Sequence, residues 1–377
     1  MVRETYAARA ARAYLAMQRS FQARGGGYRR DEGLPLPWAA AHLWPFSRAL
    51  VATLDVAGID AELPDDIDVE WAIDDRLRVL ERYWDASREP PAYSSDVRGS
   101  RVGGDRYYDD NAWVGLGLVE LERIRPGSGY LERAEELFRF AVSGWSWDQE
   151  PSPGGVFWVE QGVGTGRTNH DRNTVSSAPN AELGLHVAEL KGARGEGAVD
   201  AGGSVGPGDM YEWVLHTLDA SHGTDAAGTG LFWDKVRGDG TIDRTFWSYN
   251  QGSMVGLNVL LAWSRQAERA EYLRRAESIA RKALRHYAGA YDEQPAAFNA
   301  IFFRNLLLLR AASDDGELRG EIVQAIRDYV DRAWDQWRDR RDRFRLPRGG
   351  VTLLNQSAIV QLLALLAWEP EQYGRIA

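Results

Sequence analysis

The feature that most constrains the fold of this 377-residue chain is that apolar residues recur with helical spacing along its whole length. Apolar side chains recur three and four positions apart, the period of an amphipathic helix, and no stretch of strand length alternates with a period of two. The segments with this spacing are Tyr6–Phe21, Leu43–Val56, Val69–Tyr83, Trp113–Leu121, Tyr130–Val142, Leu183–Leu190, Tyr211–Leu218, Met254–Trp263, Tyr272–Tyr287, Ile301–Leu309, Ile322–Trp337 and Ile359–Trp368. The sequence therefore predicts an all-α protein, with short β pieces only around Gly155–Val159 and Gly230–Trp233, where glycines flank aromatic residues.

The helical segments are of two kinds. One kind is rich in Gly, Ala and Leu and holds few charges; its members begin near Asp110, Pro179, Asn250, Asn299 and Asn355. Their neighbours along the chain carry a charged face. A helix that is apolar nearly all round is buried, and an amphipathic helix lies outside it. Alternation over twelve segments predicts an (α/α)6 barrel of six helical hairpins with inner and outer rings, and we expect residues 1–377 to form one domain of this type.

Polar residues gather at the start of each apolar segment. They are Asp109–Asn111, Ser176–Ser177, Tyr249–Gln251, Asn299 and Asn355–Gln356. Helix capping explains part of this, because Asn, Asp and Ser side chains accept hydrogen bonds from the unpaired N–H groups of a first turn. If the inner helices run parallel, however, all of these starts meet at one mouth of the barrel. A ring of polar groups above an apolar core predicts a binding site there.

Composition excludes several classes of function. The net charge is −10 and no basic stripe is present, which argues against a nucleic-acid partner. There is no cysteine, so disulfides, thiolate metal sites and cysteine nucleophiles are excluded, and the six histidines show no metal-ligand spacing. No apolar run reaches the length of a membrane span, and residues 1–28 lack the apolar centre of a signal peptide. We expect a cytoplasmic monomer with no metal, cofactor or membrane partner.

The run YYDDNAW at residues 107–113 has the most chemical content. Asp109 and Asp110 stand at the start of an apolar helix, where capping and the helix dipole alone would favour carboxylates. Neighbouring residues can also point their carboxyl groups into one cleft, and a retaining glycosidase needs two carboxyls about 5–5.5 Å apart. Two like charges that close raise one pKa, so that one group stays protonated near neutral pH. The pair alone leaves both interpretations open.

A family resemblance favours the catalytic interpretation. Residues 107–121, YYDDNAWVGLGLVEL, closely resemble the signature of glycoside hydrolase family 76, the endo-α-1,6-mannanases. Further matches follow in the same order at residues 130–134, 154–158, 172–176, 247–252 and 298–304. The resemblance implies an (α/α)6 barrel and a retaining, metal-free mechanism. It also implies that Asp109 is the nucleophile and Asp110 the general acid/base, with α-1,6-mannan or mannooligosaccharides as the substrate.

Further residues are candidates for contact with the sugar, because they belong to these motifs or to the polar helix starts. They are Tyr108, Asn111, Trp158, Asn173, Tyr249, Asn250, Gln251 and Phe298. Capping explains residues 249–251 equally well, and core packing competes for Trp158. Arg304, one turn inside an apolar segment, is expected to pair with a carboxylate as part of the scaffold, because an unpaired buried charge is costly.

Two other classes of function remain open. One is a different enzyme on the same barrel, either another α-glycosidase or a sugar epimerase; epimerases of this barrel type depend on histidines, and the scattered histidines here argue against one. The other is a non-catalytic carbohydrate-binding protein, which would bind sugar without turnover. The intact aspartate pair favours an enzyme.

Overall fold

The computed structural model describes residues 4–23, 26–29, 40–97, 104–147, 153–161, 170–196, 205–222 and 230–377. Within these ranges it contains α1 (Tyr6–Phe21), α2 (Leu43–Ala57), α3 (Val69–Leu80), α4 (Tyr108–Ile124), α5 (Tyr130–Ser143), α6 (Thr174–Ala193), α7 (Pro207–Leu218), α8 (Ser248–Ser264), α9 (Arg269–Tyr287), α10 (Ala296–Ala312), α11 (Gly316–Arg332) and α12 (Leu353–Leu365). Each predicted segment corresponds to one of these helices, and the predicted all-α fold is confirmed.

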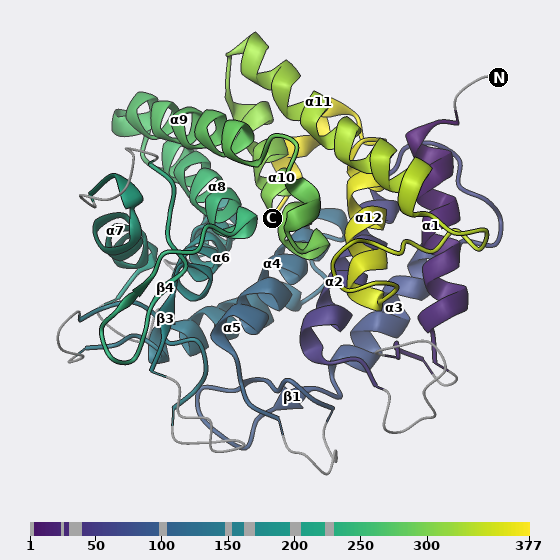
Figure 1. Cartoon of the computed structure of the whole chain (residues 1–377). Coiled ribbons are helices and arrows are strands. Elements are labelled where there is room, and N and C mark those ends of the chain that lie inside the picture. The colour runs from purple at the N-terminus through teal and green to yellow at the C-terminus, as the bar shows by residue number, and fades with distance from the viewer. Residues whose placement is uncertain are drawn as a thin grey trace.

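The even-numbered helices form a closed inner ring. Each packs on the next, from α2 through α4, α6, α8 and α10 to α12, and α12 returns to pack on α2. The odd-numbered helices cover this ring from outside, with α3 on α2, α5 on α4, α7 on α6, α9 on α8 and α11 on α10. The remaining pair joins the two ends of the chain, because α1 lies against α12 (Figure 1). The fold is therefore an (α/α)6 barrel built from six hairpins.

The difference between the two rings follows from the apolar patterning of each helix. In the outer helix α9 the buried residues fall on one face, three or four positions apart: Tyr272, Ala276, Ile279, Ala280, Ala283, Leu284 and Tyr287. In the inner helix α12 every residue except Leu354 is buried. A stripe three or four residues apart fits a helix that rests on one surface, whereas a helix surrounded by neighbours must be apolar or internally paired on all sides.

Two inner helices approach so closely that one position requires glycine. A Cβ atom on Gly252 of α8 would lie 2.6 Å from the Cα atom of Phe302 in α10. A backbone atom cannot move aside as the end of a side chain can, so any larger residue would push the two helices apart. The contact sets the spacing of the helices whose first turns carry Tyr249 and Phe298.

Several inner helices begin before the first residue of the apolar segment that predicted them. Helix α6 starts at Thr174, so that Pro179, which the sequence places near the start, lies inside the helix. Helices α8 and α10 likewise start before Met254 and Ile301, the first residues of their apolar segments. In α6 and α8 the reason is that the first turn is largely polar, so the apolar period begins only one or two turns later; α10 begins with Ala296, Ala297 and Phe298 before the polar Asn299.

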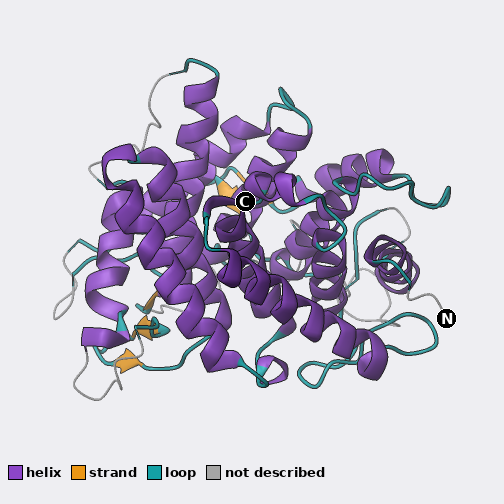
Figure 2. Cartoon of the chain, turned by 90° about the horizontal axis from the view of Figure 1, so that it is seen from above, coloured by secondary structure: helices purple, strands orange, loops and turns teal. Residues whose placement is uncertain are grey.

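Strands are short and lie among the loops between the helices, in two separate places (Figure 2). Strand β1 (Trp84–Asp85) pairs with β2 (Ala92–Tyr93), and an antiparallel sheet has the order β3 (Arg172–Asn173), β4 (Lys235–Val236), β5 (Ile242–Asp243). The two predicted β regions appear as single bridges, which pair Val156 with Trp145, Phe157 with Arg172 and Phe232 with Asp219. Among the helices in the described ranges, none has both the length and the apolar character needed to cross a membrane.

Candidate active site

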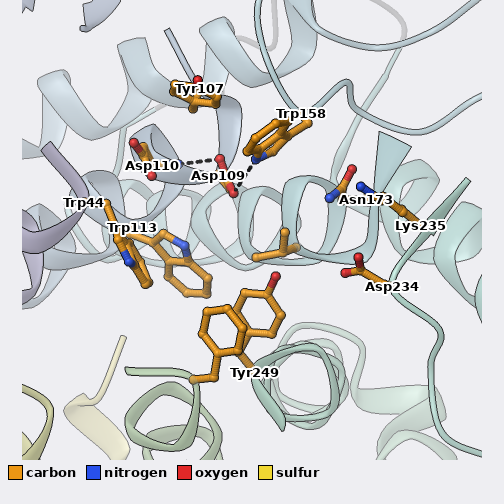
Figure 3. A pocket seen from close by; sticks show the side chains of 12 residues that line it. Trp44, Tyr107, Asp109, Asp110, Trp113, Trp158, Asn173, Asp234, Lys235 and Tyr249 are labelled. Carbon is orange, nitrogen blue, oxygen red and sulfur yellow. Dashed lines mark hydrogen bonds between the residues drawn. The ribbon is translucent and has the colours of Figure 1, made fainter. Parts of the chain in front are cut away.

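The N-terminal ends of five inner helices open into one cavity of about 350 Å³. Its wall includes residues from the starts of these helices: Trp44 in α2, Asp109, Asp110 and Trp113 in α4, Val175 in α6, Tyr249 in α8 and Phe298 in α10 (Figure 3). Tyr107, Trp158, Asn173, Asp234 and Lys235 complete the lining. The inner helices therefore run parallel, and the polar starts of α4 and α8 meet at one mouth. The start of α12 is different, because Asn355 uses its amide to bond the backbone carbonyls of Arg348 and Gly350.

Asp109 lies in the first turn of α4, where its carboxyl receives two hydrogen bonds. Its Oδ1 accepts from the backbone N–H of Asp110 at 3.0 Å, and its Oδ2 accepts from the indole Nε1–H of Trp158 at 3.1 Å. Burial raises the pKa of Asp109 to about 7, although both hydrogen bonds lower it in part. A carboxyl with this pKa ionises near neutral pH, and its two donors hold the carboxylate in one orientation.

Asp110 is adjacent in sequence but lies in different surroundings. Within the described part of the chain, no group donates a hydrogen bond to its carboxyl. Burial raises the pKa of Asp110 well above its usual range, the charge of Asp109 raises it further, and the cation of Arg48 lowers it in part. Asp110 therefore keeps its proton under conditions in which Asp109 has lost its own. Two carboxyls whose surroundings separate their pKa values can serve as base or nucleophile and as acid.

The loop that carries Trp158 is fixed by backbone hydrogen bonds on both sides. The Trp158 carbonyl accepts from the N–H of Tyr108 at 3.1 Å, and the Trp158 N–H donates to the carbonyl of Asp171 at 2.9 Å. The ring of Tyr107 packs against the indole with the centroids 5.0 Å apart. These contacts hold the indole N–H toward the carboxyl of Asp109.

Two pairs of aromatic rings form part of the cavity wall. Tyr249 and Phe298 stack face to face, with centroids 3.8 Å apart and an angle of 11° between the rings. Trp44 and Trp113 pack with centroids 6.0 Å apart (Figure 3). Flat rings with a polar edge suit the apolar face of a pyranose while they leave its hydroxyl groups free to hydrogen-bond. The arrangement fits a carbohydrate better than a charged ligand.

A third carboxyl, Asp234, lines the cavity and was not predicted from the sequence. It accepts a hydrogen bond from Asn250 at 3.4 Å, and burial raises its pKa to about 6 although Lys235 lowers it in part. It precedes β4 rather than a helix, so neither the helical spacing nor the helix starts pointed to it. In the described ranges, no group of three or more His, Asp or Glu side chains is arranged to hold a metal ion.

The structure brings half of the predicted sugar-contact residues to the cavity. Trp158, Asn173, Tyr249 and Phe298 line it. Asn173 also has a buried side-chain oxygen, Oδ1, with no hydrogen-bond partner among the described residues.

The other four predicted contact residues lie behind the wall of the cavity. Tyr108 stacks on Phe140, with centroids 4.4 Å apart. The amide of Asn111 bonds the backbone of Tyr93 and Tyr107, and the amide of Gln251 bonds the backbone of Phe232 and Trp247. Asn250 supports Asp234. The sequence predicted these residues to contact sugar because they flank the site, but their side chains tie the helix starts to neighbouring loops.

Comparison with known proteins agrees with this geometry. The sequence profile of glycosyl hydrolase family 76 matches residues 82–347, well over half of the chain. The chain belongs to glycosyl hydrolase family 76. It is therefore a glycoside hydrolase, as the motifs at residues 107–121 and 298–304 predicted. No curated protein sequence matches it.

Solved structures share the barrel at low sequence identity. A family 76 mannosidase from Bacteroides thetaiotaomicron superposes with a TM-score of 0.78 at 21% identity, over 96% of this chain and 98% of its own. An inactive α-1,6-mannanase variant from a Salegentibacter species, with two adjacent aspartates changed to asparagine and α-1,6-mannotriose bound, has a TM-score of 0.70 at 18% identity, over 96% and 99%. A D-mannose isomerase also shares the fold, with a TM-score of 0.63 at 13% identity, over 96% and 99%. At these identities the likeness shows the fold alone.

Proposed function

We propose that this glycoside hydrolase cleaves α-1,6-mannosidic linkages in mannan or mannooligosaccharides with retention of configuration. Asp109 is the nucleophile and Asp110 the general acid/base. The observation that carries this assignment is the difference between two adjacent carboxyls in one cavity. Asp109 accepts two hydrogen bonds and ionises first, whereas Asp110 accepts none from the described residues and keeps its proton.

The reaction proceeds in two displacements. A carboxylate oxygen of Asp109 attacks the anomeric carbon, the bond from that carbon to the glycosidic oxygen breaks, and the proton of Asp110 passes to the leaving oxygen. The sugar is then held as an ester on Asp109. In the second displacement the carboxylate of Asp110 takes a proton from water, the water oxygen attacks the anomeric carbon, and the ester bond to Asp109 breaks. Two inversions give net retention.

The rest of the cavity holds the sugar for these steps. The stacked pair Tyr249 and Phe298 and the tryptophans Trp44 and Trp113 offer ring faces to pyranose faces. Asp234 and Asn173 add polar side chains to the lining, and the Asp234 carboxyl can accept hydrogen bonds from hydroxyl groups. Burial, with the charges of Asp234 and Asp109, raises the pKa of Tyr249 well above its usual range, so its hydroxyl stays protonated and can donate to the substrate.

The preference for α-1,6-linked mannose is supported by the structural relatives. The Salegentibacter enzyme is an α-1,6-mannanase, and its inactive variants were captured with α-1,6-mannotriose and α-1,6-mannotetrose. The epimerase alternative has less support, because no histidine lies among the described residues that line the cavity. A sugar-binding protein without activity would have no need for two buried carboxyls that differ in their proton affinity.

Product analysis tests the proposal. Wild-type protein and the Asp109→Asn/Asp110→Asn double variant are incubated with linear α-1,6-mannan and with α-1,6-mannotetraose, and products are separated by chromatography. β-1,4-mannan serves as the linkage control. We expect short mannooligosaccharides from the wild type and the α-1,6 substrates only, and NMR at early times should show the α-anomer first. A β-anomer at early times would refute the retaining mechanism, and cleavage of another α-glycan instead would refute the mannan preference.

A further inference from the structure

A buried arginine lies directly behind the tryptophan wall of the cavity. Arg48 is on α2, 3% exposed, and its guanidinium sits over both rings of that wall, 5.5 Å from the Trp44 centroid and 5.4 Å from the Trp113 centroid. Its Nη2 donates to the backbone carbonyl of Trp113 at 3.3 Å. Trp113 is three residues after Asp110 on α4, so the two share one face of that helix. Arg48 therefore packs against the face of α4 that also carries Asp110, although its guanidinium forms no ion pair or hydrogen bond with that carboxyl.

No carboxylate is dedicated to this cation. Among the described residues, none forms an ion pair with Arg48, and its Nε is buried without a hydrogen-bond partner. The nearby acids Asp55 and Glu120 both bond Arg304 of α10 instead. The neighbouring inner helix α12 contributes only the amide of Gln361, which donates to the backbone carbonyl of Arg48. A buried cation without a partner is costly, so a further negative charge nearby would be stabilised.

We propose that Arg48 is a positioning residue of the reaction, the counter-ion of Asp110 whenever that carboxyl is ionised. This inference rests on the proposed role of Asp110 as the acid/base. Asp110 becomes a carboxylate when its proton passes to the leaving oxygen, and it remains one until it takes a proton from water. During that interval Arg48 offsets the negative charge through the low-dielectric interior behind the cavity. Arg48 and Trp44 lie outside residues 82–347, which the family profile matches.

The electrostatics around both groups agree with this geometry. Burial and the cation of Arg304 lower the pKa of Arg48 to about 9, and the charges of Asp55, Glu120 and Asp110 oppose the change. The groups that act on Asp110 are Asp109 on its own helix, which raises its pKa, and Arg48 on α2, which lowers it. Arg48 is thus the cation that favours the ionised form of Asp110, while Arg304 is already bound to two carboxyls.

The test isolates the titration of Asp110 and does not depend on activity. Protein labelled with ¹³C at aspartate carboxyls is titrated by NMR in the Asp109→Asn background, where the neighbouring acid no longer titrates. The Asp110 signal is assigned by its loss in Asp109→Asn/Asp110→Asn. Adding Arg48→Met should move the titration of Asp110 to a pH at least about one unit higher, because an opposite charge at close range has been removed. Arg48→Lys keeps the charge and should leave it nearly in place, and the Asp234 signal is the internal control.

Each outcome decides the proposal. If Asp110 titrates at the same pH with Met and with Arg at position 48, the arginine only packs against the tryptophans and the proposal fails. If Arg48→Met does not fold, Arg48→Lys decides, because a shift of a whole unit in that charged variant would overturn it. In the active enzyme, Arg48→Lys should keep the basic limb of the kcat/KM profile, whereas Arg48→Met should move this limb to higher pH and leave the acid limb in place. If mannan is not the substrate, the NMR result still stands.

Discussion

Two carboxyl pairs of the inner helices, one half-buried and one fully buried, have opposite surroundings. At the mouth, Asp109 and Asp110 occupy the first turn of α4 without an ion-pair partner among the described residues. Toward the other end, Asp55 of α2 and Glu120 of α4 both bond Arg304 of α10. Arg304 Nη1 lies 2.6 and 2.7 Å from the two Asp55 oxygens, and its Nη2 donates to Glu120. The ten residues from Asp110 to Glu120 correspond to about 15 Å along the same helix.

The comparison shows that burial by itself does not make a carboxyl catalytic. At the closed end one guanidinium binds both acids and ties three inner helices together, so those acids stabilise the scaffold, as the sequence predicted for Arg304. At the mouth no guanidinium bonds either acid of the pair among the described residues, and donors from Trp158 and the backbone reach only Asp109. The unequal supply of hydrogen-bond donors separates the pKa values of the two acids, and acid/base chemistry requires that difference.

The largest effect should come from Asp109→Asn. The change keeps the shape of the side chain but removes the nucleophile, so kcat should fall roughly 10⁴-fold or more. The melting temperature should stay the same or rise, because a buried carboxyl without an ion-pair partner is lost. Initial rates on α-1,6-mannotetraose and a thermal melt measure the two effects. If Asp109→Asn remains active, Asp109 is not the nucleophile, and the acids at the mouth would no longer differ in role from the acids at the closed end.

The matched change at the closed end is Arg304→Met. It should destabilise the fold by about 3–5 kcal/mol, because Asp55 and Glu120 would be left buried without their cation. Urea unfolding of the wild type and the variant gives the difference. The triple change Asp55→Asn/Glu120→Gln/Arg304→Met should recover part of the loss. An unfolding free energy that does not change in Arg304→Met would mean that the ion pairs contribute nothing to stability.

The pH dependence of activity should follow the mouth pair. Asp109 must be ionised to attack, and its pKa of about 7 means that kcat/KM falls as pH drops below that value. The loss is tenfold for each unit, so activity two units lower should be about 100-fold smaller. Asp110 must be protonated, and its raised pKa places the basic limb at higher pH. Because the two acids interact, the apparent pKa values of the two limbs are properties of the pair and not of either residue alone. A pH optimum below 6 would contradict this description.

The smallest effect should come from Trp158→Phe, which keeps an aromatic ring and removes only the indole N–H that Asp109 accepts. Without this donor the Asp109 carboxylate is less stable, so the acid limb should move to higher pH. The rate at neutral pH should fall roughly tenfold, the value of one hydrogen bond to a charged group. An acid limb at the wild-type position, with a lower rate at every pH, would show that Trp158 acts by packing alone.

The sequence by itself determined the barrel and the location of the carboxyl pair. Apolar spacing is a local property that each helix carries in its own residues, and its two kinds separate inner from outer helices. Asp109 and Asp110 are covalent neighbours, so whatever brings one to the mouth brings the other. The starts of α4 and α8 could also be predicted to meet, because parallel inner helices all begin at the same end of the barrel.

Only the tertiary structure decided which side chains face the cavity. Asp234 lies on a loop beside β4, and Arg48 of α2 packs behind the rings of Trp44 and Trp113. Asn111 and Gln251, next to cavity-lining residues in sequence, turn instead toward backbone groups that need hydrogen bonds. Such choices depend on which partner lies within about 3 Å after the helices have packed, and no spacing along the chain records that distance.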